Sequence, residues 1–106
     1  MRDYVILYIP TSRRFIALLH GIIDAVHYGA RLARVAGGFT IRPVLGGWIN
    51  SHGKTEVEII FQVICYCESS TLPELKALVY QYAHEIKALY SQESVSVETL
   101  EGLNFV

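Results

Sequence analysis

The side chains best suited to binding a ligand are one tryptophan, two glutamates and a glutamine. Trp48 is the only tryptophan and follows the pair Gly46–Gly47, where an indole can stack on a base or a cation. Glu58 is a carboxylate in an otherwise apolar stretch, and its burial would require a cation or a donor, which a ligand can supply. Gln92 and Glu93 follow a predicted helix end, where an acid gains nothing from the helix dipole. Each residue also has a plainer interpretation. Trp48 would be a hydrophobic anchor and Glu58 a solvated charge at a strand end. Gln92 and Glu93 would be ordinary polar loop residues.

Metal and cofactor chemistry find little support in the residue spacing. The four histidines are scattered along the chain, at His20, His27, His52 and His84. Cys65 and Cys67 are two apart on a predicted strand, roughly 7 Å from each other, and lack the spacing of a zinc knuckle. We interpret both cysteines as small buried hydrophobic residues. We therefore expect neither a metal site nor a cofactor.

Two glycine pairs, Gly37–Gly38 and Gly46–Gly47, are not followed by predicted helices. They therefore form neither a P-loop nor a dinucleotide-binding fingerprint. We interpret both pairs as turn or bulge residues, the alternative being a close approach of the backbone to a ligand. No Gly-x-Ser-x-Gly motif for a serine nucleophile is present.

Alternating and helical hydropathy patterns predict the elements that must position these side chains. Strands are predicted over 4–9, closed by Pro10, over 54–67 and over 94–98, with a short tail strand over 103–106. An extended segment over 39–49 is expected to be interrupted by Pro43 and Gly46–Gly47, and a turn follows over 50–53. One helix begins at Thr11 or Ser12 and ends near Tyr28–Gly29, while residues 31–36 fit either a last helical turn or an extended link. A second begins with a capping box of Thr71 and Glu74 and continues to about Tyr90.

The predicted apolar faces follow from the same periods. The first helix has a stripe of Phe15, Leu18, Leu19, Ile22 and Val26, and the second has one of Leu75, Leu78, Val79, Tyr82, Ile86 and Leu89. On the strand over 54–67, the odd-numbered side chains from Val57 to Cys65 are all apolar and are expected to lie under the helices. The even-numbered face is mixed and is expected to meet other subunits and a ligand.

The order β-α-β-β-α-β predicts an α+β, ferredoxin-like fold over residues 1–106, a single domain with a four-stranded antiparallel sheet and both helices on one face. The opposite face of that sheet is then bare. Its expected residues include Ile6, Tyr8, Ile60, Ile64 and Tyr66. These are too apolar to be left in water, so we expect other subunits to cover them.

Composition supports self-association and excludes several classes of partner. Hydrophobic residues make up 52% of the 106 residues and charged residues only 18%, against about 25% charged in ordinary soluble domains. A small monomer of this kind would expose large apolar patches. With a net charge of −1 and no block of like charge, we expect neither a nucleic-acid partner nor a membrane partner. The two cysteines indicate a cytoplasmic setting.

Several short motifs resemble a pattern found in small phage-encoded proteins. They are Gly37-Gly38-Phe39-Thr40, then Gly46-Gly47-Trp48, then Gly53 and Glu58, and later Gln92-Glu93-Ser94-Val95. The resemblance spans about residues 37–106 and is to the PII-like (GlnB-like) superfamily, and within it to the phage S-adenosylmethionine lyases. It implies a homotrimer of ferredoxin-like subunits with ligand sites between subunits.

The resemblance implies a carbon–sulfur lyase that converts S-adenosylmethionine to methylthioadenosine and homoserine lactone, and so counters restriction-modification in the host cytoplasm. Carried over to this chain, Glu58 and Glu93 become the catalytic acids, able to hold the substrate ammonium. Trp48, Gln92, Gly46 and Gly47 become ligand-binding residues. The family's aromatic position is a tyrosine where this chain has Trp48, so a step that needs a phenol would be lost there.

Two other functions remain open from the sequence. One is a non-enzymatic PII-like trimer that binds adenine nucleotides and regulates a partner through a long loop, for which residues 44–54 are the candidate segment. The other is a phage protein that inhibits a host enzyme by surface contact.

Overall fold

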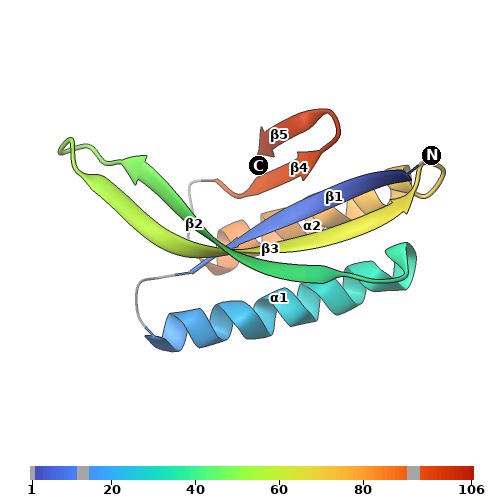
Figure 1. Cartoon of the computed structure of the whole chain (residues 1–106), viewed down its shortest axis with the longest axis horizontal. Coiled ribbons are helices and arrows are strands. Elements are labelled where there is room, and N and C mark those ends of the chain that lie inside the picture. Colours follow the sequence, from blue (N-terminus) through green and yellow to red (C-terminus); the bar gives the residue numbers. More distant parts are fainter. Residues whose placement is uncertain (1, 12–14, 91–93) are drawn as a thin grey trace.

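The computed structural model describes residues 2–11, 15–90 and 94–106. Within them the elements are β1 (Arg2–Pro10), α1 (Phe15–Ala36), β2 (Thr40–Ile49), β3 (Thr55–Glu68), α2 (Leu72–Leu89), β4 (Ser96–Thr99) and β5 (Gly102–Phe105). The strands form one sheet in the order β2-β3-β1-β4-β5, and every neighbouring pair is antiparallel. Both helices lie against the same face of this sheet (Figure 1).

The α+β, ferredoxin-like prediction is confirmed, but the sheet has five strands in the described residues and not four. The extra strand is the predicted tail, which turns back at Gly102, where φ is 125°, and pairs with β4. Val95 and Val106 continue this pairing beyond both strands, since the Val106 N–H donates to the Val95 carbonyl at 2.9 Å. The tail is therefore an integral edge strand of the sheet.

The core lies between the helices and the odd-numbered side chains of β1 and β3. Val5, Leu7, Ile9, Val63 and Cys65 are all buried there. The prediction for the odd-numbered face of β3 holds from Phe61 onward and is wrong for Val57 and Ile59, which are exposed. The reason is geometric, because the β2–β3 hairpin extends beyond the ends of both helices (Figure 1).

The segment over 40–49 is a regular strand, although Pro43 and the pair Gly46–Gly47 were expected to interrupt it. Residues 40–49 pair one to one with residues 55–64 of β3. Pro43 is tolerated because β2 is an edge strand, where a missing N–H need not break a ladder. The turn predicted over 50–53 is confirmed, with Gly53 at φ 74° and its N–H donating to the Asn50 carbonyl. Residues 44–54 are thus a strand and a tight turn, not the long loop of a regulatory protein.

Helix α1 differs from its prediction in both its end and its buried face. It passes through Gly29 and ends at Ala36, where Gly37 adopts φ 96° and its N–H donates to the Ala33 carbonyl at 2.7 Å. This is the αL arrangement that commonly ends a helix. In the predicted stripe, Leu19, Ile22 and Val26 are exposed, while the side chains of Phe15 and Leu18 lie outside the described part of the structure.

Small residues explain why α1 packs through a different face. Gly21, Ala25 and Gly29 recur every fourth residue and are all buried, so they lie along one line of the helix. A Cβ on Gly21 would lie 3.2 Å from the Phe61 ring, and a Cβ on Gly29 would overlap the Phe39 ring. The glycines therefore make room for the Thr11 methyl, for the Phe61 ring of β3 and for the Phe39 ring that precedes β2, and this close approach decides which side of α1 faces the core.

Substitution of Gly29 tests this close packing. Gly29→Ala should raise helix propensity by about 1 kcal/mol, but overpacking against Phe39 should cost about 1–3 kcal/mol. We expect a net loss in the free energy of unfolding, measured by urea denaturation. The exposed neighbour Ala30 provides the control: Ala30→Gly should lose only the propensity term of about 1 kcal/mol. A Gly29→Ala protein more stable than the parent would contradict this account.

Helix α2 follows its prediction in the buried stripe and departs from it at the start. Leu75, Val79, Tyr82 and Ile86 are buried, whereas Leu89 is exposed. The Thr71 side chain makes no capping hydrogen bond, so the capping box with Glu74 is not formed. Thr71 has φ −87° and ψ −17°, a helical conformation and not the extended one that directs an N-cap hydroxyl at the next turn.

Candidate functional site

A cleft of about 330 Å³ opens on the outer face of the sheet, the face away from the helices, near the β2–β3 hairpin. Four of the six predicted site residues line it: Gly46, Gly47, Trp48 and Glu58. Gln92 and Glu93 lie outside the described residues. The first described residue after them, Ser94, lines the same cleft.

Strand register accounts for the meeting of Trp48 and Glu58. Gly46 lies opposite Glu58, and Trp48 lies opposite Glu56. Residues directly opposite one another share a face of the sheet, so the indole and both carboxylates belong to the outer face of the hairpin. Trp48 is 47% exposed and Glu58 is half-buried. The cleft therefore offers an accessible aromatic surface beside a negative charge.

Gly46 and Gly47 have neither of the roles predicted for them as turn or bulge residues, because they lie inside a strand paired without a bulge. Gly46 instead permits close side-chain packing. A Cβ at this position would overlap Cδ1 of Ile60, and Ile60 itself lines the cleft. The absence of a side chain at Gly46 thus gives the cleft part of its shape.

A polar network on the same face contains residues that the sequence reasoning missed. The Tyr8 hydroxyl donates to Oε1 of Glu98 at 2.6 Å and accepts from Nε2 of Gln62 at 3.1 Å. The Tyr4 hydroxyl shares its hydrogen between Oε2 of Glu98 at 3.4 Å and the Thr99 carbonyl at 3.3 Å. Oε1 of Gln62 is buried and has no hydrogen-bond partner among residues 2–11, 15–90 and 94–106. Tyr8 also lines the cleft, so the network fixes one of its walls.

The environment of Tyr8 keeps its hydroxyl protonated. Burial raises the pKa of Tyr8, and the hydrogen bond to the Glu98 carboxylate raises it further. Burial, and after it the negative charge of Glu98, raises the pKa of Tyr4. Near neutral pH both phenols therefore act as hydrogen-bond donors to Glu98 and not as bases.

The cysteine thiols lie away from the cleft. Cys65 and Cys67 are free thiols buried on the core face, and burial raises the pKa of Cys65 to about 11. A thiol with so high a pKa is a poor nucleophile. Across the described residues, His, Cys, Asp and Glu nowhere gather in groups of three that could hold a metal ion.

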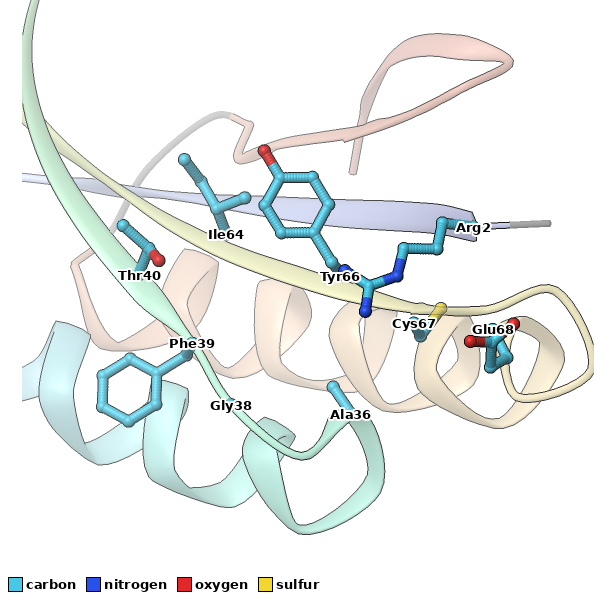
Figure 2. Close-up of a pocket in the computed structure, with 9 residues that line it drawn as sticks. All are labelled: Arg2, Ala36, Gly38, Phe39, Thr40, Ile64, Tyr66, Cys67 and Glu68. Atoms are coloured by element: carbon cyan, nitrogen blue, oxygen red, sulfur yellow. The ribbon is translucent and has the colours of Figure 1, made fainter.

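A second cavity, of about 420 Å³, lies at the opposite end of the sheet and contains none of the predicted site residues (Figure 2). Arg2 extends alongside Tyr66, and Glu68 lies at the end of the cavity. Arg2 and Glu68 occupy opposite positions in the β1–β3 register. Because its two charges are of opposite sign, this cavity has no charge preference for a cationic ligand. The Trp48–Glu58 cleft is therefore the better candidate site.

Neither protein-family models nor curated proteins match this sequence. Solved structures, in contrast, match the fold of this chain. A phage SAM lyase in complex with S-methyl-5'-thioadenosine superposes with a TM-score of 0.65 at 13% identity, covering 99% of this chain and 88% of that one. The phage SAM lyase in its apo state gives a TM-score of 0.58 at 16% identity, covering 99% and 86%.

The divalent cation tolerance protein CutA from Archaeoglobus fulgidus gives a TM-score of 0.61 at 19% identity, covering 94% of this chain and 82% of that one. At these identities the likenesses concern the fold. The predicted resemblance to phage SAM lyases and PII-like proteins is confirmed at that level. No helix in the described residues has the length and hydropathy to cross a membrane.

The pKa of Cys65 yields a prediction for stability at high pH. The unfolded thiol ionises near pH 9 and the folded thiol near pH 11, so the unfolded chain releases its proton first. The stabilising contribution is complete below pH 9 and is lost as pH rises to about 11. Urea denaturation across this range should show a steeper decline in the parent protein than in Cys65→Ala. Tyrosine ionisation is common to both proteins, so equal slopes would contradict the prediction.

Proposed function

We propose that this protein is an S-adenosylmethionine lyase that releases methylthioadenosine and homoserine lactone. The observation that carries the proposal is the cleft itself. It joins the accessible Trp48 indole to the Glu58 carboxylate, on a fold similar to that of a phage SAM lyase complexed with S-methyl-5'-thioadenosine. A sulfonium substrate suits this pairing, since aromatic faces and carboxylates both attract cations.

The proposed reaction needs no protein nucleophile. A carboxylate oxygen of the substrate attacks its own γ-carbon, and the bond from that carbon to sulfur breaks. Sulfur keeps the electron pair, so the sulfonium becomes the neutral thioether of methylthioadenosine and the carboxylate becomes the lactone ester. No proton is gained or lost in this step. The protein's task is to hold a folded conformer in which the reacting atoms meet and to exclude water as opposite charges cancel.

The cleft residues have separate tasks in this proposal. Glu58, with Glu93, attracts the cationic part of the substrate, and Trp48 offers it an aromatic face. Gln92 binds the ribose or the adenine, and Gly46–Gly47 shape the cleft, since the missing side chain of Gly46 makes room for Ile60. Tyr8 supplies a phenol in the cleft. The tyrosine of the family that the sequence resembles corresponds to Trp48 in this chain, so the phenol here comes from a different strand. The Tyr8 hydroxyl donates to Glu98 and accepts from Gln62, so the ring is held as a fixed wall against which the substrate packs.

Self-association is part of the proposal, because the hairpin alone leaves apolar side chains in water. Leu45 is 75% exposed and Ile49 65% exposed. Val57 and Ile59 are exposed on the helix-side face of the sheet, where the hairpin extends beyond both helices. A homotrimer, as in the PII-like proteins that the sequence resembles, would cover this surface and so place a neighbouring subunit beside the cleft that the same hairpin lines. A phage protein of this kind would act in the host cytoplasm.

Product analysis tests the activity. Incubation with S-adenosylmethionine should yield methylthioadenosine and homoserine lactone in equal amounts, detected by liquid chromatography with mass spectrometry. Glu58→Gln should lower kcat/KM about tenfold to a hundredfold, the effect of losing a charged hydrogen bond. Glu74→Gln, at an exposed position of α2, is the matched control and should be unchanged. Absence of methylthioadenosine with the parent protein would overturn the proposal.

Light scattering tests the assembly. The parent protein should have three times the 11.9 kDa chain mass, and Leu45→Asp should reduce the mass at micromolar concentration by placing a charge in the covered surface. Ile23→Asp, at an equally apolar and 56% exposed position of α1, is the control and should leave the mass unchanged. Dissociation by Ile23→Asp alone would assign the contact to α1 instead.

A further inference from the structure

We propose that Phe105, on the C-terminal strand β5, is a second aromatic ligand-binding residue of the cleft and stacks on the flat base of the ligand. The inference deepens the proposed function and rests on it for the identity of that base as adenine. The motifs that suggested the lyase do not include Phe105. Its strand, β5, is the tail strand that the sequence adds to the expected four-stranded fold.

The exposure of Phe105 is the first observation. Its side chain is 70% exposed, whereas Phe61 is buried in the core. An aromatic ring left in water forgoes the stabilisation that burial gives. Phe105 nevertheless lines the cleft together with Ser96, which lies opposite it in the β4–β5 register. A hydroxyl beside an accessible ring is suited to a heterocyclic base, which presents a flat apolar face and a polar edge.

The direction of the ring follows from strand alternation. Asn104 donates from Nδ2 to the Tyr80 hydroxyl of α2 at 2.9 Å, so its side chain is directed to the helix face of the sheet. Leu103 and Phe105 are then directed to the outer face, since successive side chains alternate. The outer face is the one on which the cleft opens.

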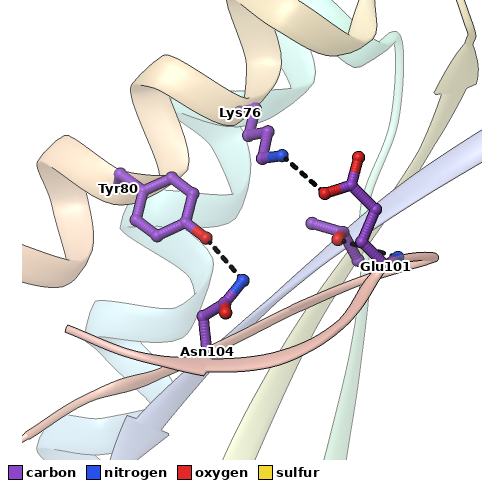
Figure 3. A network of polar contacts seen from close by, with 5 residues as sticks. Lys76, Tyr80, Glu101 and Asn104 are labelled. Carbon is purple, nitrogen blue, oxygen red and sulfur yellow. Dashed lines mark hydrogen bonds and ion pairs between the residues drawn. The ribbon is translucent and has the colours of Figure 1, made fainter.

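Contacts with α2 hold the β4–β5 hairpin in place (Figure 3). Besides the Asn104–Tyr80 bond, Nζ of Lys76 pairs with Oε2 of Glu101 at 3.5 Å. Within the turn, the Glu101 N–H donates to Oγ1 of Thr99 at 3.2 Å. The strand that carries Phe105 is thus held on its helix side, so the backbone at Phe105 is in place before any ligand arrives, which lowers the entropic cost of binding.

The two ends of the cleft differ in charge. Trp48 and Glu58 come from the β2–β3 hairpin, while Phe105 and Ser96 come from the β4–β5 hairpin, with Tyr8 of β1 between them. A ligand with one cationic part and one uncharged aromatic part would place its cation beside Glu58. Its base would then lie at the Phe105 end.

Binding measurements on three ligands test the assignment. S-adenosylmethionine contains both base and cations, whereas methylthioadenosine and adenosine contain the base without a sulfonium or ammonium group. By isothermal titration calorimetry, Phe105→Ala should weaken all three about tenfold, as expected for loss of base stacking, and Phe105→Trp should retain binding. Leu103→Ala is the matched control. Leu103 is 49% exposed on the same strand and face but does not line the cleft, so binding should be unchanged.

The outcomes separate this inference from the lyase proposal. Unchanged binding by Phe105→Ala would overturn the inference, and weakened binding of S-adenosylmethionine alone would place the cation at Phe105 and also overturn it. If the parent protein binds methylthioadenosine and adenosine in a Phe105-dependent way but forms no product, the lyase proposal fails and the base site stands. Circular dichroism of each variant confirms that the fold is retained.

Discussion

Two helices cover one face of this sheet, and they cover it over only part of its length (Figure 1). This constraint sorts the side chains of β1 and β3 into two sets. Odd-numbered residues under the helices, such as Leu7 and Val63, are wholly buried, while even-numbered residues such as Ile6 and Tyr66 remain in contact with solvent. Ile64 is an exception, because it is buried within the single chain although it was expected on the bare face. The candidate site lies on the outer set because only there can a ligand reach the sheet. Where the β2–β3 hairpin extends beyond the helices, the helix-side face keeps exposed apolar residues such as Leu45 and Val57, and these make self-association part of the proposed function.

The Tyr8–Glu98 contact makes this outer face more than an uncovered apolar surface. A carboxylate among isoleucines and tyrosines is costly unless donors satisfy it. Two tyrosine hydroxyls do so here, and Gln62 donates in turn to Tyr8. The resulting network links side chains of β1, β3 and β4 across three adjacent strands. Because Tyr8 is held on both sides, the wall that it gives the cleft is set by the protein and does not await a ligand.

The sequence reasoning succeeded where local pattern suffices and failed where packing between distant segments decides. The turn over 50–53 and the strand that follows it are encoded by local sequence. Glu58, ten residues after Trp48, could therefore be placed on the neighbouring strand near the indole. A glycine at position 29 favours a helix end, since glycine weakens helices, yet Gly29 lies inside α1 and packs against Phe39, in the link between α1 and β2. The sequence places Tyr8 on the outer face, but its meeting with Glu98 depends on the register of β1 with β4, and that of Phe105 with the cleft depends on the pairing of β4 with β5, neither of which a local signal gives.

The cleft takes its two ends from β2 and β5, which are the two edge strands of the sheet. An edge strand has backbone groups that no neighbouring strand pairs, and proteins commonly protect such edges. On β2, Pro43 removes one donor from this edge, but the exposed Leu45 and Ile49 keep the strand apolar. A site built at two unprotected edges is open in a single chain. In the proposed trimer, the same association that protects the edges would also enclose the ligand, so assembly and binding would be stabilised by one set of contacts.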